Sequence, residues 1–101
     1  MKTLLNLTFA ALLMGLAPLS FAGDVAAGKA KSMTCAGCHG TNGISINPMW
    51  PNLAGQKQAY LASSLQMYRD GRRKNAMMSA MAKNLTDADI ANLAAYYSSL
   101  K

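Results

Sequence analysis

The pentapeptide Cys35-Ala36-Gly37-Cys38-His39 constrains this chain more than any other stretch of its sequence. Two thiols three residues apart, followed at once by an imidazole, form the pattern typical of covalent attachment of c-type haem. Each thiol can add to one haem vinyl group and leave a thioether. Because the thiols lie about one helical turn apart, both can reach the macrocycle from one side. The motif therefore predicts one covalent haem c, held by Cys35 and Cys38, with His39 as an axial iron ligand.

Three other kinds of site use the same residue types. A structural zinc site needs four ligands, so a chain with two Cys and one His would have to recruit an aspartate. A thioredoxin-like redox pair lies near a strand–helix–strand unit, and the sequence shows no such alternation. A plain disulfide would leave His39 without a role, so haem attachment explains more of the residues. The available aspartates are Asp24, Asp70, Asp87 and Asp89.

Residues 1–22 have the pattern of a secretory signal peptide. Lys2 provides a positive start, and the run from Leu4 to Leu16 is largely apolar but too short to span a membrane. Ser20-Phe21-Ala22 places small residues where a signal peptidase cuts. An uncleaved N-terminal anchor is the alternative. We expect cleavage after Ala22, export to the periplasm and no stable membrane insertion after cleavage.

Cleavage at this point would leave residues 23–101, enough for one small domain. A domain of this size buries little surface and usually needs a covalent or metal staple, which a bound haem would supply. It contains nine Lys or Arg and four Asp, a formal charge of +5; two haem propionates would lower this to about +3. Aromatic residues are few and the basic residues do not line one helix, which argues against a nucleic-acid partner.

Residues 24–34 have the pattern of a helix that Asp24 can cap. Gly28 lies inside it, at a cost to helix stability of about 1 kcal/mol. We therefore expect another helix to approach closely at Gly28; a tolerated glycine is the alternative. The apolar positions recur at the spacing of one buried helical face: Ala26, Ala30 and Met33.

An irregular segment rich in Gly, Asn and Pro follows the motif. A metal-binding His needs an acceptor for its other ring nitrogen, and the free carbonyl of Pro51, twelve residues after His39, could be that acceptor. Leu53 could pack against the porphyrin. Trp50 could donate its indole N–H to a haem propionate, although a buried core Trp explains it equally well.

Residues 57–69 are predicted to form a second helix that Asp70-Gly71 ends. Its expected buried face comprises Tyr60, Leu61, Ser64, Leu65 and Tyr68. Four cations lie at its end within six residues: Arg69, Arg72, Arg73 and Lys74. They form either a solvated face or a patch that steers an acidic redox partner.

Three Met residues occur within five positions, at Met77, Met78 and Met81. A haem iron with His on one side accepts a thioether on the other, which raises the reduction potential. One of the three is thus a candidate sixth ligand, and the other two would line the pocket. Together with the thiols and imidazole of the motif, they would also suit copper(I), so a soft-metal module is a minor alternative.

The last helix is predicted to begin at Thr86, with Asp89 in the capping-box position. Both Asp87 and Asp89 also favour the positive end of its dipole. The expected buried stripe comprises Ile90, Leu93, Ala94, Tyr97 and Leu100.

Taken together, residues 23–101 resemble a class I c-type cytochrome, most closely the small periplasmic cytochromes of the c-553 type and single halves of their dihaem relatives. The resemblance is carried by Gly28, the Cys35–Gly40 motif, Pro51–Gln56, the Met78 segment before Leu85-Thr86-Asp87, and Leu93–Tyr97.

The resemblance implies an all-α fold of three to four helices wrapped around one haem. The first and last helices should cross near Gly28 and Tyr96, and His39 should donate to the Pro51 carbonyl. In that branch of the family the first Met of the pair binds iron, which points to Met78, with Met81 as second choice.

A single haem site without a second catalytic constellation implies a soluble periplasmic one-electron carrier and not an enzyme. Its partners would be redox proteins that serve as electron donor and acceptor. A haem enzyme or ligand sensor needs an open sixth position, and the Met residues argue against one. The main alternative is a haem-binding subunit of a larger periplasmic dehydrogenase or oxidase.

Overall fold

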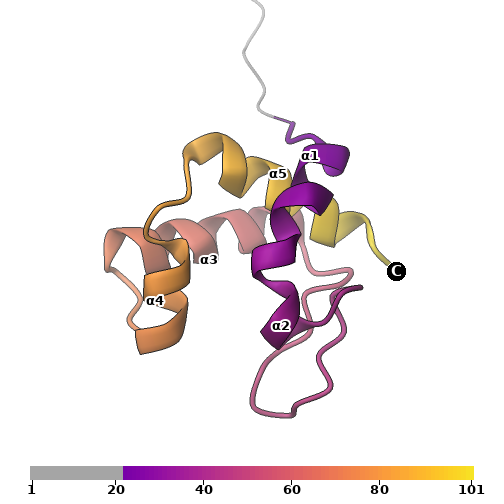
Figure 1. The fold of residues 1–101 in the computed structure, drawn as a ribbon. Helices are drawn as coiled ribbons and strands as arrows, with labels where there is room; N and C mark the ends of the chain where they lie inside the picture. Colours follow the sequence, from indigo (N-terminus) through magenta and orange to yellow (C-terminus); the bar gives the residue numbers. More distant parts are fainter. Residues whose placement is uncertain (1–21) are drawn as a thin grey trace, which may run out of the picture.

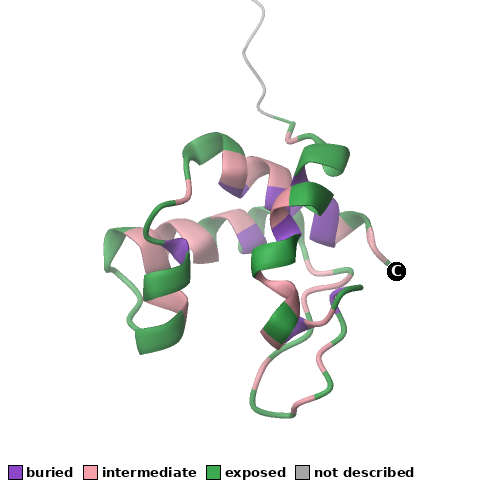
Figure 2. Ribbon diagram, in the orientation of Figure 1, coloured by how far each residue is buried: buried purple, intermediate pink, exposed green. Residues whose placement is uncertain are grey.

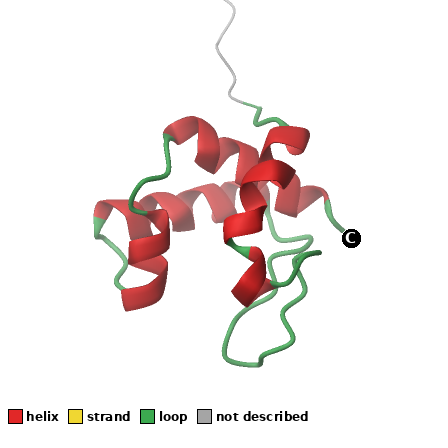
Figure 3. Ribbon diagram, viewed as in Figure 1, coloured by secondary structure: helices red, strands yellow, loops and turns green. Residues whose placement is uncertain are grey.

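The computed structural model describes residues 22–101, so the expected apolar leader lies outside the described residues. The elements in chain order are α1 (Val25–Lys31), the 3₁₀ turn η2 (Ser32–Thr34), α2 (Ala36–His39), α3 (Gln58–Asp70), α4 (Ala76–Ala82) and α5 (Asp87–Ser99). Figures 1 and 3 show helices joined by loops, and residues 22–101 contain no strand. The all-α prediction is confirmed.

The described chain has five α-helices, more than the three to four expected. The additional ones are short, because α2 has four residues and α4 has seven. None of the helices in residues 22–101 is long and apolar enough to cross a bilayer.

The N-terminal and C-terminal helices cross at Gly28, as expected. A Cβ atom on Gly28 would overlap the carbonyl oxygen of Asn92 and lie 2.8 Å from the Cβ of Tyr96. At the start of α1, Asp24 accepts from the N–H groups of Ala26 and Ala27, and its own N–H donates to Asn92 Oδ1 at 2.8 Å. Only a residue without a side chain permits this approach of the two backbones.

The face that α1 buries is not the predicted one. Gly28 and Ser32 are buried, whereas Ala26 and Ala30 are exposed and Met33 is 73% exposed. Backbone contact at Gly28 turns the face that carries Gly28 and Ser32 toward α5, so the predicted apolar positions point outward. Met33 also lies in the 3₁₀ turn η2, where three residues complete a turn and the helical spacing no longer applies.

The core lies where α5 meets α1 and α3 (Figure 2). Four of the five residues predicted for the α5 stripe are buried, and Leu100 is half-buried. The capping box of Thr86 and Asp89 is present in both directions, as predicted. The buried cluster consists of Leu61, Leu93, Ala94, Tyr96 and Tyr97.

Helix α3 ends where the sequence indicated. Gly71 takes a left-handed conformation (φ 83°), and its N–H bonds the carbonyls of Met67 and Tyr68. Leu61 on this helix is buried, but Tyr60 is 52% exposed, so the prediction for Tyr60 is wrong. A hydrogen bond from Arg73 lowers the pKa of the Tyr60 hydroxyl, which belongs to the polar surface of α3.

The Met-rich stretch forms a helix, which the sequence analysis did not predict. Asn75 caps it, its Oδ1 accepting from the N–H groups of Met77 (3.1 Å) and Met78 (3.0 Å). Figure 1 shows the resulting α4 beside the end of α3, with a connection leading on to α5.

Candidate functional site

His39 is the best-defined polar side chain of the site. It ends α2 and is only 6% exposed. Its Nδ1 lies 2.8 Å from the carbonyl oxygen of Pro51, the contact that the sequence analysis expected. Because a carbonyl only accepts, Nδ1 carries a proton, and in a neutral imidazole Nε2 is then the nitrogen with the free lone pair. The imidazole is therefore set up to bind a metal through Nε2.

The two thiols belong to the single turn of α2 and its N-cap. Cys35 precedes the turn and Cys38 lies within it, and both are free and partly buried. The N–H of His39 bonds the Cys35 carbonyl at 3.0 Å, which closes the turn. At its end Gly40 adopts a positive φ of 87°, where a Cβ atom would overlap the carbonyl oxygen of Ile44.

The loop after the motif is folded back on itself by backbone hydrogen bonds. The carbonyl of Gly43 accepts from the N–H groups of Leu53 (2.8 Å) and Ala54 (3.0 Å). The side chain of Asn52 accepts from the N–H of Ser45 at 2.8 Å. These bonds bring Pro51 to His39 although twelve residues separate them.

Trp50 and Leu53 occupy different places. Trp50 is half-buried and, with Ala36, Gly37 and Cys38, lines a hollow of about 430 Å³ beside the motif. Trp50 is therefore not the buried core residue that the alternative interpretation of the sequence predicted. Leu53 is half-buried and packs against the core cluster that includes Leu61.

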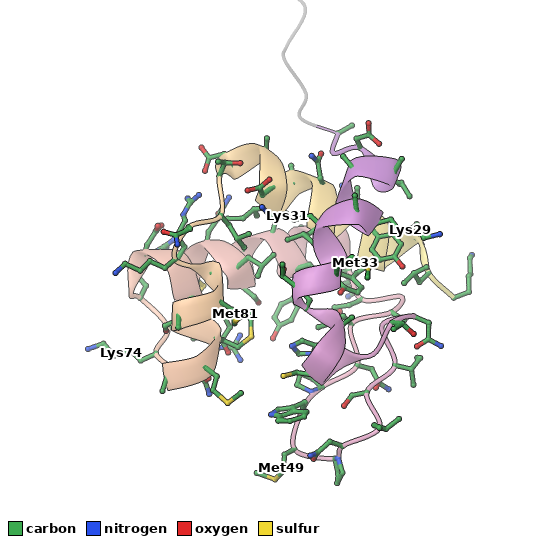
Figure 4. The ribbon with its side chains drawn as sticks, in the orientation of Figure 1. Lys29, Lys31, Met33, Met49, Lys74 and Met81 are labelled. Carbon is green, nitrogen blue, oxygen red and sulfur yellow. The ribbon has the colours of Figure 1, made fainter. Side chains whose placement is uncertain are left out.

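The three candidate Met ligands differ in exposure. Met77 is 55% exposed and Met81 is 52% exposed, whereas Met78 is half-buried. All three lie on α4, and Figure 4 shows Met81 there, on the other arm of the molecule from Met33 and Met49.

A hydroxyl group that the sequence analysis assigned only to the core lies beside the motif. Tyr97 is 3% exposed, and its hydroxyl has no hydrogen-bond partner within residues 22–101. Burial raises the pKa of this hydroxyl well above the usual range, and Cys35 of the motif is its neighbour. The sequence pattern placed Tyr97 in an apolar stripe but could not predict its contact with the motif, because Cys35 is far away in the sequence.

The aspartates that a zinc site would have to recruit are used elsewhere. Asp24 caps α1 and Asp89 caps α5. Asp70 and Asp87 pair with Arg69 at 3.1 Å and 2.8 Å. No three His, Cys, Asp or Glu side chains gather as a metal site in the part of the chain that the structure describes. The donor set fits a haem, with two free thiols beside one buried imidazole.

The four cations after α3 do not form a patch of unpaired charge, and their role in docking a partner stays a prediction. Arg69 is bound to two carboxylates, and its hydrogen bonds to Asp87 and then Asp70 raise its pKa. Arg72 lies 3.3 Å from Asp70, and the guanidinium of Arg73 lies 4.7 Å above the Tyr68 ring. The sequence pattern counted charges within six residues but could not show that Asp87 folds back onto Arg69.

Comparison with known proteins gives consistent matches. Residues 25–101 match the family model described as cytochrome c. Cytochrome c-554(548) of Halomonas halodenitrificans is 56% identical over 81 residues, which cover 77% of this chain and 98% of that protein. Cytochrome c4 of Pseudomonas aeruginosa is 43% identical over 100 residues, 99% of this chain but 49% of the relative.

Solved structures agree. The crystal structure of reduced recombinant cytochrome c4 from Pseudomonas stutzeri has a TM-score of 0.75 at 40% identity, covering 79% of this chain and 47% of that one. Thiosulfate dehydrogenase from Marichromatium purpuratum has a TM-score of 0.70 at 33% identity, covering 76% of this chain and 19% of that one. The chain thus spans about half the length of its c4 relatives. It belongs to the cytochrome c family of electron carriers and has one covalently bound c-type haem.

Proposed function

We propose that this protein is a soluble periplasmic one-electron carrier, not an enzyme, in which His39 and Met78 are the axial ligands of the haem iron. The observation that carries the proposal is the buried imidazole of His39, whose Nδ1 donates to Pro51 at 2.8 Å directly after the two thiols. The haem, when bound, supplies reversible one-electron chemistry at its iron.

The chain's own residues hold and orient the group in this proposal. Cys35 and Cys38 bind it through thioethers, and the Pro51 carbonyl keeps the imidazole in the tautomer that leaves Nε2 free. Leu53, which packs against the core cluster, would also pack against the haem. Trp50, which lines the hollow beside Cys38, is the proposed donor to a propionate.

Among the Met residues, burial favours Met78 as the sixth ligand. A ligand must point inward, and Met78 is half-buried while its two neighbours are more than half exposed. The Asn75 cap holds its backbone N–H at 3.0 Å. Met81, on the same helix, is the second choice, and a thioether from either would raise the potential.

Docking of a redox partner is proposed at the connection between α3 and α4, the helix that carries the Met residues. Lys74 and Arg73 have no carboxylate partner within residues 22–101, whereas Arg69 and Arg72 are paired with carboxylates. Electron-transfer contacts are small and transient, so these two cations would speed the encounter without producing a tight complex.

A second function is favoured by one match. The likeness to thiosulfate dehydrogenase covers only 19% of that chain, so a domain of this kind can lie within a larger protein. This protein could likewise be the haem subunit of a dehydrogenase or oxidase. Co-purification with a stoichiometric larger subunit from the native host would favour that function over a free carrier.

Visible spectra test the proposal on protein matured in a periplasm that attaches c-type haem. We expect sharp c-type bands on reduction and a weak long-wavelength sulfur-to-iron band when oxidised. Met78→Ala should remove the sulfur band, whereas Met81→Ala should keep it. Haem bands without the sulfur band in the native protein would refute Met ligation, and a colourless protein with stoichiometric copper would favour the soft-metal module.

A further inference from the structure

We propose that Arg69 is a positioning residue, which clasps the two ends of the Met-bearing segment, residues 71–86, and so keeps Met78 on the iron. This inference rests on the proposed Met78 ligation. The segment leaves the helical scaffold where α3 ends and rejoins it where α5 begins. Its two ends lie close together, since Arg69 in the last turn of α3 contacts Asp87 in the first turn of α5.

Little packing by the protein's own side chains holds this segment in place. Within residues 71–86, all of which the structure describes, Ala82 is the only buried residue. Most of the others are exposed, including the half-exposed Met77 and Met81. Segments with few buried apolar contacts open locally before the rest of a fold does. The position of Met78 therefore depends on how firmly the ends are tied.

Arg69 provides that tie from the last turn of α3. Its Nη1 donates to Asp87 Oδ1 at 2.8 Å and to the Leu85 carbonyl at 3.3 Å, both at the far end of the segment. Its Nε donates to Asp70 Oδ1 at 3.1 Å, at the near end. One planar guanidinium thus spans both ends, and its side chain is only 23% exposed. A lysine ammonium lacks the fork needed to make these bonds together.

These contacts indicate that Arg69 holds its own chain together and does not serve to dock a partner. An arginine that serves a partner keeps its N–H groups free, whereas the Nε and Nη1 of Arg69 are engaged within its own chain. Asp87 belongs to the first turn of α5, so the clasp fixes the segment to the scaffold helix that forms the core. Without it, the segment has more conformations in which Met78 is away from the iron.

Replacement of the sixth ligand by added imidazole measures how often Met78 leaves. The test uses the oxidised holoprotein and follows loss of the sulfur-to-iron band after mixing with imidazole. We expect Arg69→Gln and Asp87→Asn each to raise the replacement rate about fivefold, the size of effect typical of one charge-assisted contact near a surface. Arg69→Lys should fall between them and the native protein.

Arg72→Gln is the matched control. Arg72 is a neighbouring cation whose guanidinium pairs with Asp70 at 3.3 Å but does not reach the far end of the segment, and its side chain is 61% exposed. Its loss should leave the imidazole rate unchanged. The double variant Arg69→Gln/Asp87→Asn should react no faster than Arg69→Gln alone, because both changes remove the same contact.

The outcomes separate this inference from the proposed function. A native-like imidazole rate in Arg69→Gln and Asp87→Asn, with the sulfur band present, overturns the clasp and leaves Met ligation standing. A rate that rises equally in Arg72→Gln overturns it as well, since the effect would then be general charge loss. If the native protein shows no sulfur band, Met ligation fails and the clasp fails with it. Should Arg69→Gln not fold, Asp87→Asn, which keeps the other Arg69 contacts, decides.

Discussion

The crossing of α1 and α5 and the Met-bearing segment are held in place by different forces. At the crossing, two backbones touch through Gly28, and α5 buries most of its stripe. The Met-bearing segment, residues 71–86, buries only Ala82. Its order depends on the Asn75 cap of α4 and on the Arg69 contacts.

This difference implies two levels of local stability. Apolar burial at the crossing is lost only when the domain unfolds, whereas hydrogen bonds near the surface can open one segment at a time. The Cys35–His39 motif follows α1 in the chain after only the short turn η2, so it is attached directly to the crossing of α1 and α5. We therefore expect the His side of the site to be rigid and the Met side to open first.

The largest expected effect comes from Gly28→Ala. The new methyl group would overlap the Asn92 carbonyl oxygen, and neither helix can move away without losing core contacts. We expect a loss of about 3 kcal/mol in the free energy of unfolding, measured by denaturant titration. Ala27→Leu, an exposed change in the same helix, should shift it by no more than about 0.5 kcal/mol. Equal effects of the two changes would contradict the close crossing.

Removing helix caps in the two regions sharpens the comparison. Thr86→Ala removes the cap of α5 and should lower the free energy of unfolding by about 1 kcal/mol. Asn75→Ala removes the cap of α4, so it should mainly speed imidazole replacement of the sixth ligand and change global unfolding less. Hydrogen exchange across both helices would measure this. A larger global loss from Asn75→Ala would show that the segment unfolds together with the core.

A smaller effect concerns Asp89 and pH. Its hydrogen bonds to the backbone and side chain of Thr86, aided by Lys31 at 3.5 Å, lower the pKa of Asp89. A lowered folded-state pKa means that the stability is present above the unfolded value of about 3.9 and is lost as pH falls through the folded value. We expect thermal midpoints to fall below about pH 4, and Asp89→Asn to flatten that fall. An unchanged acid limb in the variant would argue against the linkage.

The smallest expected effect concerns association. Lys74 lies in the Met-bearing segment, far from Lys29 in Figure 4. If partners dock there, Lys74→Gln should slow reduction by an acidic redox protein about twofold at low salt, and added salt should remove the difference. Lys29→Gln serves as the control for net charge. Equal slowing by both variants would mean that the reduction rate depends on the total charge of the protein and not on docking at the Met-bearing segment.

The sequence alone was sufficient for features that depend on near neighbours or on a covalent motif. The pattern of two thiols and an imidazole predicted the haem, Asp24 and Thr86 predicted helix starts, and the 3.6-residue period predicted the α5 stripe. The His39–Pro51 contact was also expected, because a ligand imidazole needs an acceptor and the loop offered a carbonyl without an N–H.

Other features were decided by tertiary structure. The buried face of α1 was predicted wrongly because backbone contact at Gly28 outweighed the apolar positions Ala26, Ala30 and Met33. Arg69 changed from a docking cation to a structural contact because Asp87, 18 residues later, folds back onto it. Periodicity and capping are local properties of a chain, whereas the partner of a charge and the face of a crossing depend on which distant segments meet.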